Sequence, residues 1–181
     1  MKTRPMITRK MNPILITIDV EECDIPLEYG FSISLEEQLA ISKEGLSHFM
    51  QIVEEAGVPV TIFCTGVYAE NNPEWIKSLN PMHELASHGY FHGHFEASKD
   101  LKNSKDLLEK LSGKSVTGFR MARMQYVDES EILKAGYAYH SSLNPTWIPG
   151  RYDHREKTTK PIFENSINER SSFKIRRLLG I

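Results

Sequence analysis

The chain of 181 residues is long enough for one domain with its own core, and its 40 % hydrophobic and 25 % charged residues are ordinary for a globular protein. Its formal net charge of −2 gives no reason to expect nucleic acid or an anionic membrane surface as a partner. No apolar run approaches the roughly 20 residues that a membrane-spanning helix needs, so no span is expected.

The first eleven residues are basic and are interpreted as an extension before a single domain over residues 12–181. The apolar stretch ILITI after them is too short for a signal peptide, and no small-residue cleavage site follows it. The two cysteines, Cys23 and Cys64, do not make a disulfide framework. Together these features predict a cytoplasmic protein with free thiols.

The first half of the domain alternates between apolar runs and amphipathic segments. Residues 14–20 are β-branched and apolar, which is typical of a buried strand. A helix is predicted over residues 34–57, with Ser34 as its N-cap and a glutamate three residues later. A second strand is expected over residues 58–66, followed by a short helix over residues 72–79.

The second half continues the pattern, with a strand over 83–89, a helix over 98–113, a strand over 115–122, a helix over 128–136, a strand over 137–143 and a turn-rich loop over 144–166. Strands that alternate with helices predict parallel β-α-β units, either in an open sheet or in a barrel. In such folds the active site lies at the carboxyl ends of the strands, so the residues found there carry the functional prediction.

The first predicted strand ends in four carboxylates within six residues, Asp19, Glu21, Glu22 and Asp24. They repel one another unless a cation or a shared proton relieves them. Along an extended strand Asp19 and Glu21 point to the same side. The alternative is an acidic turn that only faces solvent.

The stretch after the third strand contains three histidines, His88, His92 and His94. In one extended strand His88 and His92 would stand about 13 Å apart, too far for one metal ion, whereas a helical turn would bring them to roughly 6 Å. Gly89 permits such a turn, and the pair could then share a cation. A histidine-rich polar loop without a metal remains the alternative.

The fourth strand ends at Arg120, in an apolar setting that favours a carboxylate partner because an unpaired buried charge is costly. A surface arginine whose aliphatic stem covers apolar residues is the alternative. Carboxylates, two imidazoles and a guanidinium at one rim form the arrangement of a hydrolytic metal site. In the loop beyond, Trp147 is a candidate for stacking on a sugar ring, against the alternative that it holds the loop down.

Three motifs resemble those of the polysaccharide deacetylases, carbohydrate esterase family 4: TIDVEE (17–22), ELASHGYFH (84–92) and GFRMARM (118–124). The resemblance covers about residues 12–165. It implies an α/β fold, the family's irregular (β/α) barrel, here missing its last strands. It also implies that Asp19 is the general base and that Arg120 pairs with it.

The resemblance further implies that Glu21, His88 and His92 bind a divalent metal ion, with zinc in first place and Glu22 as the alternative carboxylate ligand. The reaction implied is removal of N-acetyl groups from an N-acetylated carbohydrate, with Trp147 as a candidate contact for the sugar. The hydroxide that attacks would come from water, whose pKa a bound metal lowers toward about 7. Backbone N–H groups near residues 121–124 are expected to stabilise the oxyanion.

The chain departs from the family in two respects. The family's late histidine has no counterpart, since neither His140 nor His154 lies in the expected apolar strand. Only five strands are recognisable, which would expose sheet edges. A shortened gene product, a fragment, and a homo-oligomer or partner chain that completes the fold are the explanations left open. Two other functions therefore stay open: a catalytically incomplete domain that binds metal or carbohydrate, and hydrolysis of a non-sugar carbon–nitrogen bond on the same fold.

Overall fold

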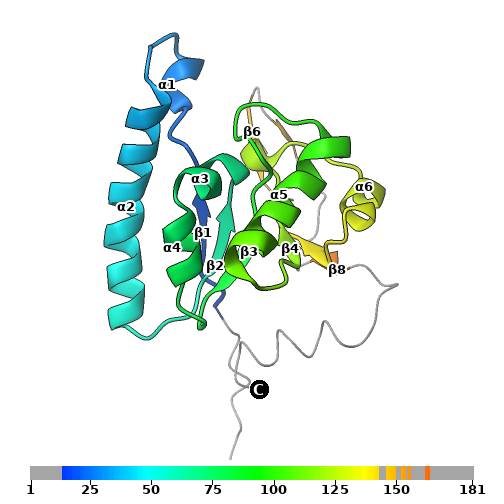
Figure 1. Cartoon of the computed structure of the whole chain (residues 1–181). Coiled ribbons are helices and arrows are strands. Elements are labelled where there is room, and N and C mark those ends of the chain that lie inside the picture. Colours follow the sequence, from blue (N-terminus) through cyan, green and yellow to red (C-terminus); the bar gives the residue numbers. More distant parts are fainter. Residues whose placement is uncertain (1–13, 143–145, 150–151, 154, 156–161, 164–181) are drawn as a thin grey trace, which may run out of the picture.

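The computed structural model describes residues 14–142, 146–149, 152–153, 155 and 162–163. Its strands and helices alternate along most of this length (Figure 1). The strands are β1 (Thr17–Val20), β2 (Thr61–Cys64), β3 (Glu84–Ser87), β4 (Gly118–Phe119), β5 (Tyr139–His140), β6 (Trp147–Ile148), β7 (Tyr152–Asp153) and β8 (Ile162–Phe163). The helices are α1 (Ile25–Glu28), α2 (Leu35–Glu55), α3 (Gly66–Asn71), α4 (Pro73–Ser78), α5 (Ala97–Ser112), the 3₁₀ turn η1 (Ala122–Met124) and α6 (Glu129–Lys134).

One sheet has the strand order β1-β2-β3-β4-β5-β8. The first five strands are parallel, and β8 pairs antiparallel with β5. This confirms the predicted α/β fold with a parallel sheet, and it places the carboxyl ends of β1 to β5 at one edge. Over the described residues the sheet stays open between β1 and β8 and does not close into a barrel.

The hydrophobic core lies between the sheet and the helices. Ile62 of β2 and Leu85 of β3 are paired in the sheet and belong to one buried cluster with Ile76 of α4 and Leu108 of α5. The opposite face of the same sheet carries several polar side chains, among them Asp19. The sheet therefore presents its apolar face to the helices and a more polar face away from them.

Local signals explain the helices that the sequence predicted well. Ser34 caps α2 through a capping box, in which its hydroxyl accepts from the Glu37 backbone N–H and the Glu37 carboxylate accepts from the Ser34 N–H. Helix α5 ends at Gly113, whose φ of +66° is the left-handed conformation that glycine adopts without strain. Both helices begin and end within two residues of the prediction.

Other expectations about the elements were wrong. Most of the first strand is not buried: β1 is the edge of the sheet in the described residues, only Val20 at its end lies in the core, and Ile14 and Leu15 before it are 87 % and 55 % exposed. Residues 144–166 are not only loop, because β6, β7 and β8 lie there. Helix α3 was missed because its six residues are too few to show an amphipathic period. No helix in the described ranges has the length and apolar character needed to cross a membrane.

Candidate functional site

The site is built where β1 and β3 end. Glu21 follows β1 directly, and His88 follows β3 directly. After His88 the chain reverses at Gly89, whose φ of +82° is a left-handed conformation. The Gly66 N–H at the start of α3 donates to the Gly89 carbonyl and fixes this turn, which returns His92 toward His88.

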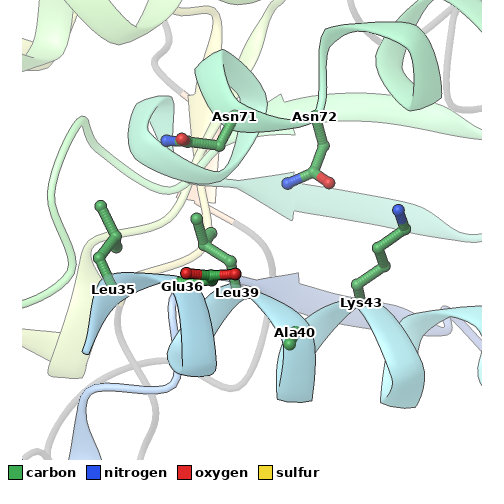
Figure 2. Close-up of a pocket in the computed structure, with 7 residues that line it drawn as sticks. All are labelled: Leu35, Glu36, Leu39, Ala40, Lys43, Asn71 and Asn72. Atoms are coloured by element: carbon green, nitrogen blue, oxygen red, sulfur yellow. The ribbon is translucent and has the colours of Figure 1, made fainter. Parts of the chain in front are cut away.

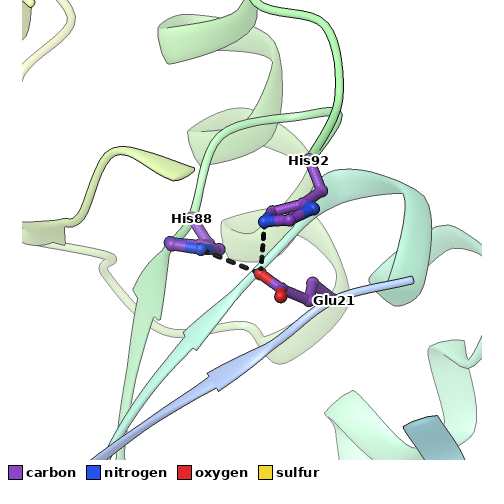
Figure 3. A group of neighbouring side chains, drawn as sticks. All are labelled: Glu21, His88 and His92. Atoms are coloured by element: carbon purple, nitrogen blue, oxygen red, sulfur yellow. Dashed lines mark ion pairs between the residues drawn. The ribbon is translucent and has the colours of Figure 1, made fainter. Parts of the chain in front are cut away.

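The side chains of Glu21, His88 and His92 converge (Figure 3). Oε2 of Glu21 lies 3.0 Å from Nε2 of His88 and 3.1 Å from Nε2 of His92. One donor atom from each residue lies within 4.8 Å of the other two, and no other group of this kind occurs in the part of the chain that the structure describes. The structure thus brings together the carboxylate and the two histidines that the sequence singled out.

Hydrogen bonds determine which imidazole nitrogens carry protons. Nδ1 of His88 lies 2.9 Å from the carbonyl oxygen of Arg120, and Nδ1 of His92 lies 2.6 Å from Oδ1 of Asp24. Both partners are acceptors, so in the neutral rings both protons sit on Nδ1 and both Nε2 atoms present lone pairs.

With both rings neutral, three acceptors face one another, and Oε2 of Glu21 is buried without a hydrogen-bond partner among the described atoms. Two ligands of one tetrahedral zinc ion, each about 2.0–2.1 Å from it, stand roughly 3.3 Å apart. The observed separations of 3.0 and 3.1 Å are close to that value. The donor set, its geometry and its unrelieved acceptor thus fit a divalent metal ion.

Asp19 and Arg120 lie beside this cluster. Nη1 of Arg120 donates to Oδ1 of Asp19 at 2.6 Å, and its other nitrogens donate to Thr17 Oγ1 and to Ser141. The guanidinium also lies 4.0 Å above the ring of Phe63. These contacts show that Arg120 has the carboxylate partner expected for it. Oδ2 of Asp19 is left facing His88, 4.0 Å from its Nε2.

Glu22, the alternative carboxylate ligand, turns the other way. Its Oε2 accepts from Thr65 Oγ1 at 2.8 Å, and its Oε1 accepts from the His92 backbone N–H at 2.9 Å. Both oxygens are used, and the residue is 7 % exposed. Glu22 therefore ties the histidine loop to β1 and β2, and Glu21 is the carboxylate that faces the imidazoles.

Two residues at the site were not assigned a role from the sequence. Asp24 contacts His92, and Arg123 contacts Asp24 through Nη2 at 2.8 Å. Arg123 also forms an ion pair with Glu28 in α1. The available signal was a second arginine three residues after Arg120, opposite an acidic turn that had more carboxylates than cations to pair with them.

Trp147 lies in β6, paired with β7, and is 53 % exposed. The Arg155 guanidinium lies 5.3 Å from the centre of its ring, and no contact in the described part of the chain joins it to the cluster. A role for Trp147 in sugar binding stays a prediction.

A separate cavity of about 400 Å³ lies between α2 and the junction of α3 with α4 (Figure 2). It is lined by Leu35, Glu36, Leu39, Ala40, Lys43, Asn71 and Asn72, and it includes none of the predicted site residues.

Comparisons with known proteins agree with the motifs. A family model described as polysaccharide deacetylase matches residues 37–140. A solved structure from Mycobacterium smegmatis, assigned as a polysaccharide deacetylase, is 26 % identical with a TM-score of 0.59 over 71 % of this chain and 50 % of its own. The chain thus spans about half the length of that structure. A search of the curated proteins gave no match.

Two further structures share the fold at lower identity. An allantoinase is 18 % identical with a TM-score of 0.56, covering 88 % of this chain and 67 % of its own. A protein of Pseudomonas aeruginosa PAO1, also assigned as a polysaccharide deacetylase, is 16 % identical with a TM-score of 0.55, covering 75 % of this chain and 57 % of its own.

Proposed function

The chain belongs to the polysaccharide deacetylase family, and on that premise we propose that it is a metal-dependent hydrolase that removes N-acetyl groups from an N-acetylated carbohydrate. The observation that carries this proposal is the cluster of Glu21, His88 and His92, with the Asp19 carboxylate directly beside it. A carboxylate and two imidazoles with further positions open is the donor set of a hydrolytic metal centre.

A divalent ion held by these three residues, with zinc as the first candidate, would polarise the amide carbonyl and lower the pKa of water toward about 7. The chain contributes the geometry. Both Nε2 lone pairs are directed to one point because both Nδ1 atoms donate to fixed acceptors. This preorganisation removes the need to reorient the rings when a ligand arrives.

Asp19 is proposed as the general base. Its Oδ1 is engaged by Arg120, while Oδ2 faces the cluster and is free to accept the proton of an attacking water. Arg120 is itself held by Thr17, Ser141 and the ring of Phe63, so it orients the carboxylate instead of following it. The pair thus fixes which oxygen meets the substrate.

Backbone N–H groups between residues 121 and 124 remain candidates for the oxyanion. The Met121 N–H donates to Ser142 Oγ and the Met124 N–H donates to the Met121 carbonyl, so these two are occupied. Ala122 and Arg123 are the donors of this stretch that we propose for the developing negative charge.

A second candidate is a domain that binds metal or carbohydrate without turnover, and one observation favours it. Ser141 shares the Arg120 side of the sheet, so His140 points to the opposite side, where its ring is buried. Among the described residues no third imidazole reaches Asp19 to protonate a leaving amine.

We further propose a cytoplasmic location, which would favour a soluble or lipid-linked precursor as substrate.

The proposal is tested by acetate release from N-acetylglucosamine oligomers with added zinc. The wild-type chain is compared with Asp19→Asn and with Asp106→Asn, a matched change in a surface carboxylate that pairs with Lys102. Activity in the wild type and in Asp106→Asn, with a loss of about 10²-fold or more in Asp19→Asn, is expected. Equal rates in all three would remove Asp19 from its role, and zinc binding without any acetate release would favour the binding domain.

A further inference from the structure

We propose that Asp24 and Arg123 are positioning residues that hold the metal ligand His92 in its binding orientation; this inference rests on the proposed function. Neither residue reaches the point on which the ligand atoms converge. Asp24 acts on His92 through the ring nitrogen remote from the cluster, and Arg123 acts on Asp24.

The contact between Asp24 and His92 is short and buried. Oδ1 of Asp24 lies 2.6 Å from Nδ1 of His92, and the two residues are 7 % and 8 % exposed. A carboxylate at Nδ1 keeps the proton on that nitrogen and turns the Nε2 lone pair toward Glu21. Without it the ring could rotate or exchange tautomers, and Nε2 would no longer be a fixed donor atom.

The two histidines differ in how they are held. Nδ1 of His88 uses a backbone carbonyl, that of Arg120, which no side-chain substitution removes. Nδ1 of His92 depends on a side chain. His92 also lies in a loop, beyond the turn at Gly89, whereas His88 follows the strand directly. Asp24 therefore supplies for His92 the restraint that the sheet provides for His88.

Arg123 holds Asp24 from the far side. Its Nη2 donates to Oδ2 of Asp24 at 2.8 Å, its Nη1 pairs with Glu28, and its Nε donates to the His92 carbonyl at 3.4 Å. One guanidinium thereby links α1, the acidic turn and the histidine loop. Arg123 has a φ of +56°, a conformation that costs a non-glycine residue energy, so the surrounding structure holds it in place.

The histidine loop packs closely against Asp24 at Gly93. A Cβ atom at Gly93 would lie 2.9 Å from Oδ2 of Asp24, closer than such contacts are normally found. The histidine loop thus approaches the carboxylate as closely as a glycine permits.

The experiment measures zinc affinity by competition with a chromophoric chelator, using Zn²⁺ alone as the probe. Asp24→Ala is expected to weaken zinc binding by about 10–100-fold, the cost usual for losing a residue that orients a ligand. Asp24→Asn keeps an acceptor oxygen for Nδ1 and should lie between Asp24→Ala and the wild type. Asp100→Asn is the matched control, because Asp100 is as buried as Asp24 but caps α5 by accepting from the Glu96 N–H.

Arg123→Gly separates positioning from folding. Glycine adopts a φ of +56° without strain, which offsets part of the stability lost with the ion pairs to Asp24 and Glu28. The variant should therefore stay folded, as urea unfolding in chelator checks, while its zinc affinity falls. A second readout is the ¹⁵N spectrum of the imidazoles without metal. The wild type should show His92 protonated at Nδ1, and Asp24→Ala should show a mixture of tautomers while His88 stays unchanged.

The outcomes are distinct. Weaker zinc binding in Asp24→Ala and Arg123→Gly, with Asp100→Asn equal to the wild type, supports the inference. Unchanged affinity and tautomers in both variants overturn it and leave the proposed function standing. A wild-type chain that binds no zinc overturns both.

Discussion

Replacing Glu21 by glutamine is expected to stabilise the metal-free protein and to abolish most of its stabilisation by zinc. Oε2 of Glu21 lies 3.0 Å from Nε2 of His88 and 3.1 Å from Nε2 of His92, and with neutral imidazole rings all three atoms are acceptors. The amide of glutamine has the same shape and supplies a donor. It can therefore give a hydrogen bond to the lone pair of His88 or of His92.

The magnitude follows from the cost of a buried acceptor without a partner, about 1–3 kcal/mol, and from the net value of a hydrogen bond, about 0.5–1.5 kcal/mol. Glu21→Gln should accordingly raise the free energy of unfolding of the metal-free protein by about 1 kcal/mol. Zinc at 100 times its dissociation constant should stabilise the wild type by about 2.7 kcal/mol. The variant loses a charged ligand and should gain little from zinc.

The assay is urea unfolding, first with a chelator and then with zinc. Glu74→Gln is the control, because Glu74 is a surface carboxylate paired with Lys77 and its loss should change stability by less than about 0.5 kcal/mol in either condition. A Glu21→Gln variant that is less stable than the wild type in chelator would refute the reasoning that Glu21 and the two imidazole Nε2 atoms face one another as acceptors. Zinc stabilisation of equal size in both would show that Glu21 is not a ligand.

Three further predictions concern residues around the cluster and the adjoining strands. Arg120→Lys should lower kcat by about 10²-fold, measured by acetate release, because lysine cannot reproduce the guanidinium contacts to Asp19. Its zinc affinity, measured by chelator competition, should stay unchanged because the backbone carbonyl that holds His88 remains. Burial lowers the pKa of His140, and the charge of Glu129 offsets part of this shift, so the unfolded chain binds more protons than the folded one. The free energy of unfolding should therefore fall as pH drops from about 6.5 toward the lowered pKa, and urea unfolding between pH 7.5 and 5 should show a shallower fall in His140→Phe. Gly118→Ala should lower the free energy of unfolding by about 1–3 kcal/mol, because the new Cβ would collide with Oη of Tyr139. Urea unfolding should show that the double variant with Tyr139→Leu recovers this loss of stability.

Much of this protein could be predicted from local sequence patterns. Ser34 and Glu37 define the start of α2, and Gly113 defines the end of α5, because capping depends on residues a few positions apart. The alternation of strands and helices predicted the parallel sheet. The order of its strand-end motifs placed acids, histidines and an arginine at one edge, since the carboxyl ends of parallel strands coincide there.

Strand lengths and burial needed the tertiary structure. β4 and β5 are two residues long and β1 is an exposed edge, although the corresponding apolar runs are longer. A strand extends only as far as a neighbour offers backbone partners, and its burial depends on what packs against it. Neither property is encoded in the run itself.

For the site as well, the sequence indicated the candidate residues and only the tertiary structure decided which of them face one another. The sequence singled out Glu21 and Glu22 as alternatives, but only the fold turns Glu21 to the imidazoles and Glu22 to Thr65. Past the end of a strand the alternation of side chains no longer holds, so direction is decided by the loops that pack there. For the same reason the contact of Asp24 with Arg123, 99 positions away, could be found only in the assembled fold.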